Sequence, residues 1–343
     1  MRPSSFLSLT TLVAALLTVS PNNQAHAQAQ VCNGYAELCT KPYNQVTYAT
    51  THNAYAFSPP GALAANQDND IPTQLKDGIR AFMLDAYAAA SPSDIQLCHG
   101  SCQLLDGGPL SKTLGQFKTF LDANPNEVVT ILWENAGNLP PSRFQTVYQA
   151  AGLANYLHTQ QAGSTNWPTL AEMISSGKRL VNFVDDGYSA SVPWLMNEYS
   201  FIFETPWQIP KGSAYPCTID RPAGGQQQSM YVLNHFISGQ INTGGQSIDV
   251  PQRGAADQTN GPDLVSHVNE CVSTFKQNPA FLAIDFYEKG SLLQTVAQLN
   301  GVTYVGKGPT NPKTPSHGAT VTSSSKAAMA AAAGAIAGAL LLA

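Results

Sequence analysis

The sequence predicts an α/β fold, a single (β/α)8 barrel of the TIM type. From Val46 onward, short β-branched or aromatic runs alternate with segments of helical spacing, which is typical of βα units and a parallel sheet. Eight such runs can be counted, and eight strands close a barrel of about 250 residues. We expect irregularity at strands five to seven, because long segments without a period follow two of them.

The predicted strands are short, and helical signals lie between them. The strands are Val46–His52, Ile79–Asp85, Ile95–His99, Val128–Glu134, Arg179–Asp185, Ser200–Thr205, Met230–Phe236 and Phe281–Tyr287. Apolar spacing predicts helices over Leu114–Leu121 and Leu264–Phe275, the second with Cys271 on its buried side. Thr169 and Glu172 have the capping-box spacing of a helix start.

Two long segments follow the sixth and seventh predicted strands. Gln208–Ser229 and Ser238–Asp263 are rich in Gly, Pro and Gln and show no period. Loops in these positions lie at the carboxyl face of a barrel, where functional sites are usually built. We therefore expect both segments to be loops around a site.

The two ends of the chain resemble targeting segments. Residues 1–27 hold an apolar stretch and Ala25-His26-Ala27, the small-x-small pattern of a secretory cleavage site. Residues 305–326 form a Pro/Thr/Ser stalk, and residues 327–343 form an uncharged tail typical of a glycolipid (GPI) anchor signal. A membrane span is disfavoured because the tail is short and mostly Ala. We expect residues 28–304 to form the domain, secreted and lipid-anchored at a membrane surface.

Six cysteines in a secreted chain predict three disulfide bonds. Zinc ligation is the alternative, although the spacings fit no usual zinc pattern. The net charge of −5, with 11% charged residues and no basic run, argues against nucleic acid as a partner, and we expect a monomer. The predicted pairs are Cys32 with Cys39 and Cys98 with Cys102, which leaves Cys217 with Cys271.

Polar side chains close several of the predicted strands. Side-chain alternation turns the large apolar residues of these strands toward the helices, so the terminal polar groups face the barrel axis. Because the carboxyl ends of parallel strands meet at one mouth, we expect these groups to share one opening. They are His52, Asn53, Asp85, His99, Glu134 and Asp285.

This set of residues suits acid–base and metal chemistry. His52 and His99 can each accept and return a proton near neutral pH. Asn53, Asp85 and Glu134 offer hard oxygen atoms, which suit Ca²⁺ or Mg²⁺. Such a cation could stabilise charge on a phosphoryl oxygen and acidify an attacking hydroxyl group.

Four motifs resemble those of a known family. Thr51–Tyr55 resembles a Ser-His-Asn-Thr-Tyr segment, and Gln74–Arg80 resembles Gln-Leu-x-x-Gly-x-Arg. Cys98–Gly100 and Ile131–Asn135 resemble segments that carry a second catalytic histidine and a calcium-ligand Glu. Over about 43–299, the chain is similar to the X-type barrel of phosphatidylinositol-specific phospholipase C and its secreted relatives.

The resemblance implies cleavage of a phosphodiester, with His52 and His99 as the catalytic histidines and Asp285 orienting His52. It implies Asn53, Asp85 and Glu134 as ligands of Ca²⁺, with Mg²⁺ as the alternative ion. We expect one of these residues, Asp85, to need a cation, because it would otherwise repel phosphate.

Two departures from the family affect the metal and the substrate. Met83 stands where calcium-dependent eukaryotic members have a further acidic ligand, so we expect weaker metal binding. Bacterial metal-free members have Arg at the position of Asp85, and no other Arg obviously replaces it. Lys289 is the one clear basic residue just past a strand end. We expect a phosphodiester of low charge: phosphatidylinositol, a glycosylated inositol lipid or a glycerophosphodiester.

Other interpretations stay open at this point. His235 is interpreted as a core residue, with a substrate contact as the alternative, and Asp185 either lines the mouth or belongs to a turn. A glycosidase could use Asp85 and Glu134, but Met230–Phe236 offers no acid opposite Glu134 and both histidines would be idle. A non-catalytic surface protein that binds a ligand through the barrel is the other rival.

Overall fold

The computed structural model describes residues 31–58, 63–243 and 246–305. The predicted signal peptide and anchor signal, and the stalk apart from its first residue, lie outside these ranges. No helix within the described ranges has both the length and the apolar character needed to cross a membrane.

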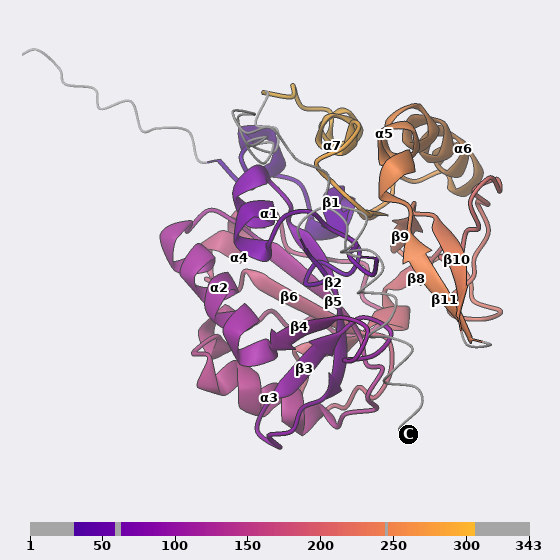
Figure 1. Ribbon diagram of the computed structural model, residues 1–343. Helices are drawn as coiled ribbons and strands as arrows, with labels where there is room; N and C mark the ends of the chain where they lie inside the picture. The colour runs from indigo at the N-terminus through magenta and orange to yellow at the C-terminus, as the bar shows by residue number, and fades with distance from the viewer. Residues whose placement is uncertain (1–30, 59–62, 244–245, 306–343) are drawn as a thin grey trace, which may run out of the picture.

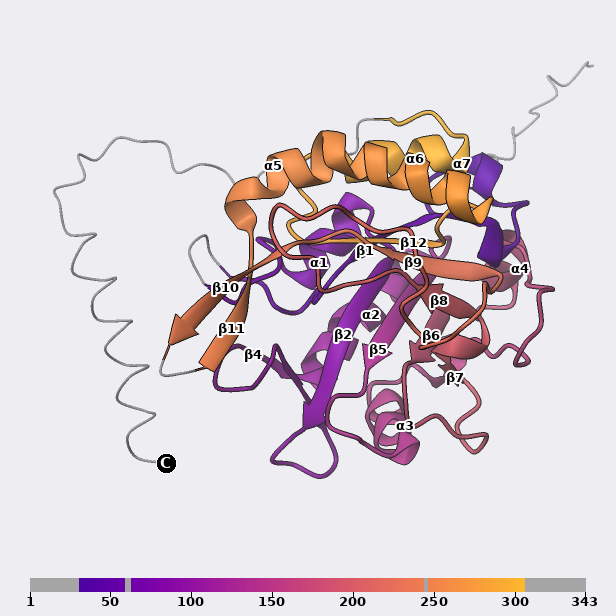
Figure 2. The same cartoon turned by 90° about the vertical axis from the view of Figure 1, so that its right-hand side faces the viewer.

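A curled parallel sheet forms the centre of the molecule (Figures 1 and 2). Its main strands follow the order β7-β6-β5-β2-β1-β12-β9-β8, and every neighbouring pair is parallel. Within the described residues no pairing joins the edge strands β7 and β8, so the barrel is open there. The strands are β1 Tyr48–Thr51, β2 Ala81–Ala88, β5 Val129–Glu134, β6 Leu180–Val184, β7 Leu195–Asn197, β8 Ile202–Glu204, β9 Met230–Asn234 and β12 Phe281–Ile284.

Helices surround the sheet, with α1 to α4 in the indigo-to-magenta half and α5 to α7 in the orange-to-yellow half (Figure 1). The α-helices are α1 Ile71–Asp77, α2 Leu110–Ala123, α3 Pro141–Ala150, α4 Leu170–Ser175, α5 Ala256–Gln258, α6 Leu264–Phe275 and α7 Leu292–Asn300. Short helical turns are η1 Ala36–Leu38, η2 Tyr43–Gln45, η3 Ala154–Tyr156, η4 Glu198–Ser200, η5 Arg253–Ala255 and η6 Thr259–Asp263. The capping box of Thr169 and Glu172 starts α4 as predicted, and α6 buries Cys271.

Two apolar clusters confirm the predicted alternation along the strands. Phe82 and Leu84 of β2 point outward and belong to one cluster with α2 residues such as Phe117. Ala81 of the same strand belongs to a second cluster inside the barrel, with Phe281 of β12. Close packing on both faces of the sheet therefore fixes which residues of each strand face the barrel axis.

Seven of the eight predicted strands lie in the parallel sheet, but the third prediction is wrong. Ile95–Cys98 forms β3, which runs antiparallel to β2 and pairs with β4, Asp106–Pro109. The remaining barrel strand is β7, which is only three residues long and gave no periodic signal. Periodicity cannot tell a barrel strand from a hairpin strand, because both alternate.

The strand β2 serves two structures in succession. Its first residues pair in parallel with β5, up to the register pair of Asp85 and Glu134. Its last residues pair antiparallel with β3, starting at Ala86 and Leu97. The β3–β4 hairpin is therefore an extension of one barrel strand.

The expectation of a plain loop over Ser238–Asp263 is also wrong. This segment contains a hairpin, β10 Ser238–Thr243 and β11 Gln246–Pro251, followed by short helical turns. A Gly-Gly pair between the two runs is a hairpin signal that was present in the sequence. The three predicted disulfide pairs are confirmed.

Candidate active site

A cavity of about 470 Å³ opens at the carboxyl ends of the barrel strands. All six polar residues that the sequence analysis placed at one mouth line it: His52, Asn53, Asp85, His99, Glu134 and Asp285. The structure thus brings these side chains together, although they come from distant parts of the chain.

His52 follows β1 and is held by three neighbours. Its Nδ1 lies 2.9 Å from Asp285 Oδ1, and Asn66 Nδ2 donates to the same oxygen at 3.0 Å. The Phe236 ring stacks on the imidazole with centroids 3.8 Å apart and planes 3° apart. Because a carboxylate oxygen accepts hydrogen bonds, Nδ1 of His52 is the donor in its contact with Asp285. This arrangement leaves Nε2 for exchange with a substrate.

His99 lies in the turn of the β3–β4 hairpin and not at the end of a barrel strand. Its Nδ1 donates to the carbonyl oxygen of Ala64 at 2.8 Å, which makes Nε2 the exchangeable nitrogen. Burial lowers the pKa of His99, while the bond to Ala64 opposes that shift and His52 adds to it. The neutral ring is therefore favoured, with a lone pair on Nε2.

One segment, Ala64–Gln67, contacts both histidines. Ala64 holds His99, and Asn66 reaches the Asp285 carboxylate beside His52. Gln67 Nε2 donates to the backbone oxygen of His52 at 2.8 Å. Sequence reasoning missed these residues, because a polar loop between two predicted elements gives no periodic signal.

Asp85 of β2 is buried, and Glu134, its register partner at the end of β5, is more exposed at the cavity. Burial raises the pKa of Asp85 well above its ordinary value, and the charge of Glu134 adds to the shift. Burial also raises the pKa of Glu134, with Asp185 adding to it. Like charges in a desolvated place favour a proton or a cation between them.

Asn53 lies next to Asp85, and the orientation of its amide bears on whether a cation fits at this place. Its backbone is left-handed (φ 45°), a conformation that Asn tolerates, and of the two orientations of its amide only one makes hydrogen bonds. In this one, Nδ2 donates to Asp85 at 2.9 and 3.2 Å and Oδ1 accepts a hydrogen bond from His52 Nε2 at 3.2 Å, a bond that requires a proton on Nε2. A half-turn brings Oδ1 against the carboxylate, an arrangement that a cation would stabilise. The donor set of Asn53, Asp85 and Glu134 therefore fits a hard divalent cation.

Carboxylates dominate the rest of the cavity. The acids that line it are Asp85, Glu134, Asp185, Glu198, Glu204, Asp249 and Asp285. Among the described lining residues, Arg221 is the one Lys or Arg, and its Nη2 donates to Glu204 Oε2 at 2.8 Å. Although burial opposes it, Glu204 raises the pKa of Arg221, so the guanidinium stays charged.

Three sequence interpretations depend on the other charged residues around the cavity. Arg221 supplies the cavity with an arginine, which the sequence had not revealed because it lies in a long aperiodic loop. Lys289 pairs with Asp257 and does not line the cavity. Met230–Phe236 offers no acid, as the sequence analysis held, but Glu204 at the end of β8 and Asp185 also line the cavity, so other acids share it with Glu134. The strand ending on Glu204 was itself predicted, and its last acid was the available signal.

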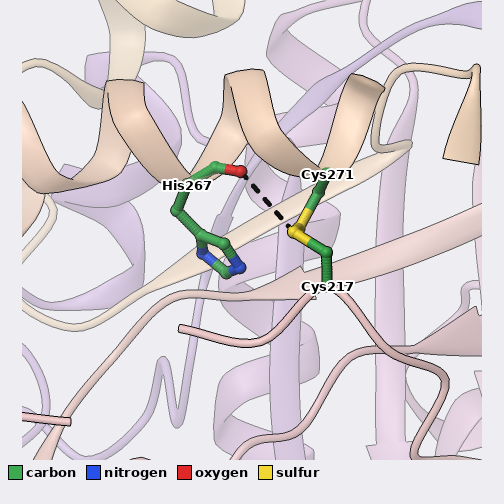
Figure 3. Close-up of side chains that lie close together, drawn as sticks. All are labelled: Cys217, His267 and Cys271. Carbon is green, nitrogen blue, oxygen red and sulfur yellow. Dashed lines mark hydrogen bonds between the residues drawn. A yellow bond between two sulfur atoms is a disulfide. The ribbon is translucent and has the colours of Figure 1, made fainter. Parts of the chain in front are cut away.

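His235 is a core residue, as the main interpretation held. It is 0% exposed, lies outside the cavity lining, and pairs with His267 through the two Nδ1 atoms at 2.9 Å. His267 also lies beside Cys217 and Cys271, within 4.8 Å of their sulfur atoms. Both sulfur atoms are used in the disulfide bond (Figure 3), so the zinc alternative does not hold here.

A curled parallel barrel with two histidines and paired acids at its mouth defines a phospholipase C-like barrel protein. The family described as PI-PLC X 1 matches residues 38–300, and the chain belongs to this family.

Two proteins of Arthroderma benhamiae are similar to the chain. An uncharacterized secreted protein is 35% identical over 292 residues, which are 80% of this chain and 65% of that protein. A PI-PLC X domain-containing protein 1 is 34% identical over 306 residues, 87% of this chain and 97% of that protein. The secreted relative and the three disulfide bonds indicate an extracellular protein.

Among solved structures, a histidine-to-tyrosine variant of the phosphatidylinositol-specific phospholipase C from Staphylococcus aureus has a TM-score of 0.50 and 17% identity. The match covers 80% of this chain and 96% of that chain. At this identity the likeness concerns the fold, and it confirms the predicted TIM-type barrel.

Proposed function

We propose that this protein is a phosphoric diester hydrolase that cleaves an inositol phospholipid or a related phosphodiester. The observation that carries the proposal is that His52 and His99 line one cavity, each with Nδ1 bonded to a protein acceptor. Each histidine thus presents Nε2 for proton exchange. Membership of the PI-PLC X family supports the same kind of chemistry.

In the proposed reaction, a hydroxyl group next to the phosphodiester attacks phosphorus. One of the two residues His52 and His99 accepts the hydroxyl proton as the new O–P bond forms. The other donates a proton to the departing alcohol oxygen as its bond to phosphorus breaks. The products are a cyclic phosphodiester and the free alcohol, and water can then open the ring with the roles reversed. Asp285 stabilises the positive charge on His52.

Asn53, Asp85 and Glu134 would hold the cation, Ca²⁺ by our proposal and Mg²⁺ as the alternative. When bound, the ion supplies positive charge for a phosphoryl oxygen and acidifies the attacking hydroxyl group. Met83 lines the cavity close by and adds no charge, which favours weak binding.

The cavity also bears on the substrate. Its carboxylates would repel further phosphate groups, and the one guanidinium is neutralised by Glu204. Leu104 and Trp207, which line the cavity, are 36% and 37% exposed, and Ile241 of β10 is 40% exposed. A headgroup with a single phosphodiester and an apolar tail suits both features. We further propose secretion and a glycolipid anchor, which would hold the cavity near its substrate.

The test is an activity panel of phosphatidylinositol, a glycosylated inositol lipid, glycerophosphodiesters and sphingomyelin, with Ca²⁺ or with chelator. We expect release of a cyclic phosphodiester from an inositol lipid and loss of this activity in the His52→Ala/His99→Ala double variant. No turnover on any phosphodiester, together with tight headgroup binding, would support a binding protein instead. Parental activity in the double variant would overturn the proposed site.

A further inference from the structure

The second histidine is carried by a small hairpin outside the barrel. The strands β3 and β4 have four residues each, and among the strands of the described ranges only β2 joins them to the parallel sheet. Hairpin turns are more mobile than the ends of packed barrel strands. Acid–base chemistry loses much of its rate when a group is misplaced by about 1 Å. The position of His99 therefore requires restraints beyond the strand pairing.

A disulfide bond encloses His99. Cys98 and Cys102 are joined, so the segment Cys98-His99-Gly100-Ser101-Cys102 is a covalent ring. Gly100 has φ +67° in this tight turn, a conformation that glycine adopts without strain. Closing so short a ring removes most of the backbone freedom of the residue inside it.

Hydrogen bonds hold the ring at three points, and one of them runs from Tyr87 Oη of β2 to the carbonyl oxygen of Gly100 at 3.3 Å. Cys98 is fully buried, and its carbonyl oxygen accepts a hydrogen bond from Tyr55 Oη at 2.8 Å. On the neighbouring strand, a Cβ atom at Gly107 would lie 2.5 Å from the Tyr55 ring, so the hairpin lies directly against this side chain. Opposite, His99 Nδ1 is bonded to Ala64.

We propose that the Cys98–Cys102 disulfide is a positioning element for the reaction, one that holds His99 Nε2 in the cavity. This inference rests on the proposed function. The bond between Nδ1 and Ala64 orients the imidazole, and the covalent ring holds the backbone from which the imidazole extends. Without the disulfide the hairpin still pairs with β2, but the turn samples several conformations and His99 reaches its place for a fraction of the time.

The experiment compares two pairs of substitutions. Cys98→Ser/Cys102→Ser opens the ring around His99, and Cys32→Ser/Cys39→Ser opens another short ring that lies outside the cavity. On an inositol lipid, we expect the first pair to lower kcat by about 10- to 100-fold with little change in KM. The second pair should lower the melting temperature but leave kcat unchanged. Equal kcat per folded molecule in both variants would overturn the inference.

A measurement without substrate separates this inference from the proposed function. The backbone N–H of His99 donates to Leu105 at 3.1 Å, and that of Ser101 donates to His99 at 2.7 Å. Hydrogen exchange of these two amides should quicken in Cys98→Ser/Cys102→Ser, while the barrel strands keep the exchange rates of the parent. Unchanged exchange at both amides would show that the disulfide restrains nothing, whatever the activity. Faster exchange in a protein that cleaves no phosphodiester would instead reject the proposed function.

Because Cys98 is buried, the serine pair risks failing to fold. Cys98→Ala/Cys102→Ala keeps the buried position apolar and opens the same ring. The same losses are expected in kcat and in amide protection, and parental values of both would again overturn the inference.

Discussion

Asp85 and Glu134 face one another across two adjacent parallel strands, and burial raises the pKa of both carboxyl groups. Asn53 brings an amide to the same place. The raised pKa values favour a proton on the pair, and the cation that we propose would replace that proton; the two states can be distinguished by experiment.

The first prediction concerns the cation. Ca²⁺ should raise the melting temperature of the parent, by the equivalent of about 2.7 kcal/mol at 100 times its dissociation constant. In Asp85→Asn this shift should be much smaller, because a ligand charge is lost. Without Ca²⁺ this variant should melt no lower than the parent, because the repulsion of Glu134 is relieved. Asp257→Asn, at a 78% exposed side chain outside the cavity, is the matched control. An equal Ca²⁺ shift in all three proteins would contradict the proposed ligands.

The second prediction concerns the histidines. His52→Ala and His99→Ala should each lower kcat by about 10² to 10⁴-fold, the usual effect of losing a positioned acid or base. His158→Gln serves as the control, because His158 is buried but lies outside the cavity. Rates are compared per folded molecule on the most active inositol lipid. If the control loses as much as the two alanine variants, the assignment of the histidines is wrong.

The third prediction concerns stability in acid. Burial lowers the pKa of His235 to about 4 and, with His235 adding, that of His267 to about 3. Unfolded histidine has a pKa near 6.5, so the unfolded chain binds protons first as the pH falls. The neutral pair of His235 and His267 therefore makes its full contribution to the free energy of unfolding above about pH 6.5. As the pH falls toward 3 to 4 this contribution is lost, by roughly 1 kcal/mol per pH unit for each histidine.

Urea unfolding at several pH values checks this sign. The parent should lose stability faster between pH 6.5 and pH 4 than His235→Leu/His267→Leu, although buried acids such as Glu198 act in the opposite direction in both proteins. Because those acids are common to both, the difference between the two slopes isolates the pair. Identical slopes would show that the two histidines titrate as in the unfolded chain.

The fourth prediction concerns the ion pair in the cavity. Glu204 is 2% exposed and receives Arg221 Nη2 and Asn234 Nδ2. Arg221→Gln should lower the free energy of unfolding by about 3–5 kcal/mol, because it leaves a buried charge without its partner. Adding Glu204→Gln should restore much of the loss. The exposed pair of Lys118 and Asp122 should show no comparable effect when Lys118 is changed to Gln. Additive losses in the double variant would mean that the two side chains do not interact.

Most of the barrel strands could be predicted from the sequence, because packing on both faces of the sheet imposes an alternation of side chains along each strand. Phe82 and Leu84 pointed outward as predicted, and the inward residues brought Asp85 and Glu134 to the mouth. Local signals also predicted the three disulfide pairs and the start of α4.

The errors have a common physical origin. Whether a strand joins the barrel or a hairpin depends on its partner, and the partner of Ile95–Cys98 is set by contacts distant in sequence. His99 nevertheless lines the expected cavity. The reason is that β2 continues beyond its pairing with β5, at the carboxyl end of the barrel, and its last residues pair with the hairpin that bears His99. Arg221 and Asn66 lie in segments without regular structure, where only the folded chain reveals their neighbours.

The double use of β2 constrains how this chain can vary. Asp85 pairs with the barrel and the very next residue, Ala86, pairs with the hairpin that bears His99. An insertion or deletion of one residue upstream within β2 would turn Asp85 away from the axis and shift the hairpin in the same step. Length changes in descendants of this gene should therefore accumulate in the outer loops and spare the eight residues from Ala81 to Ala88.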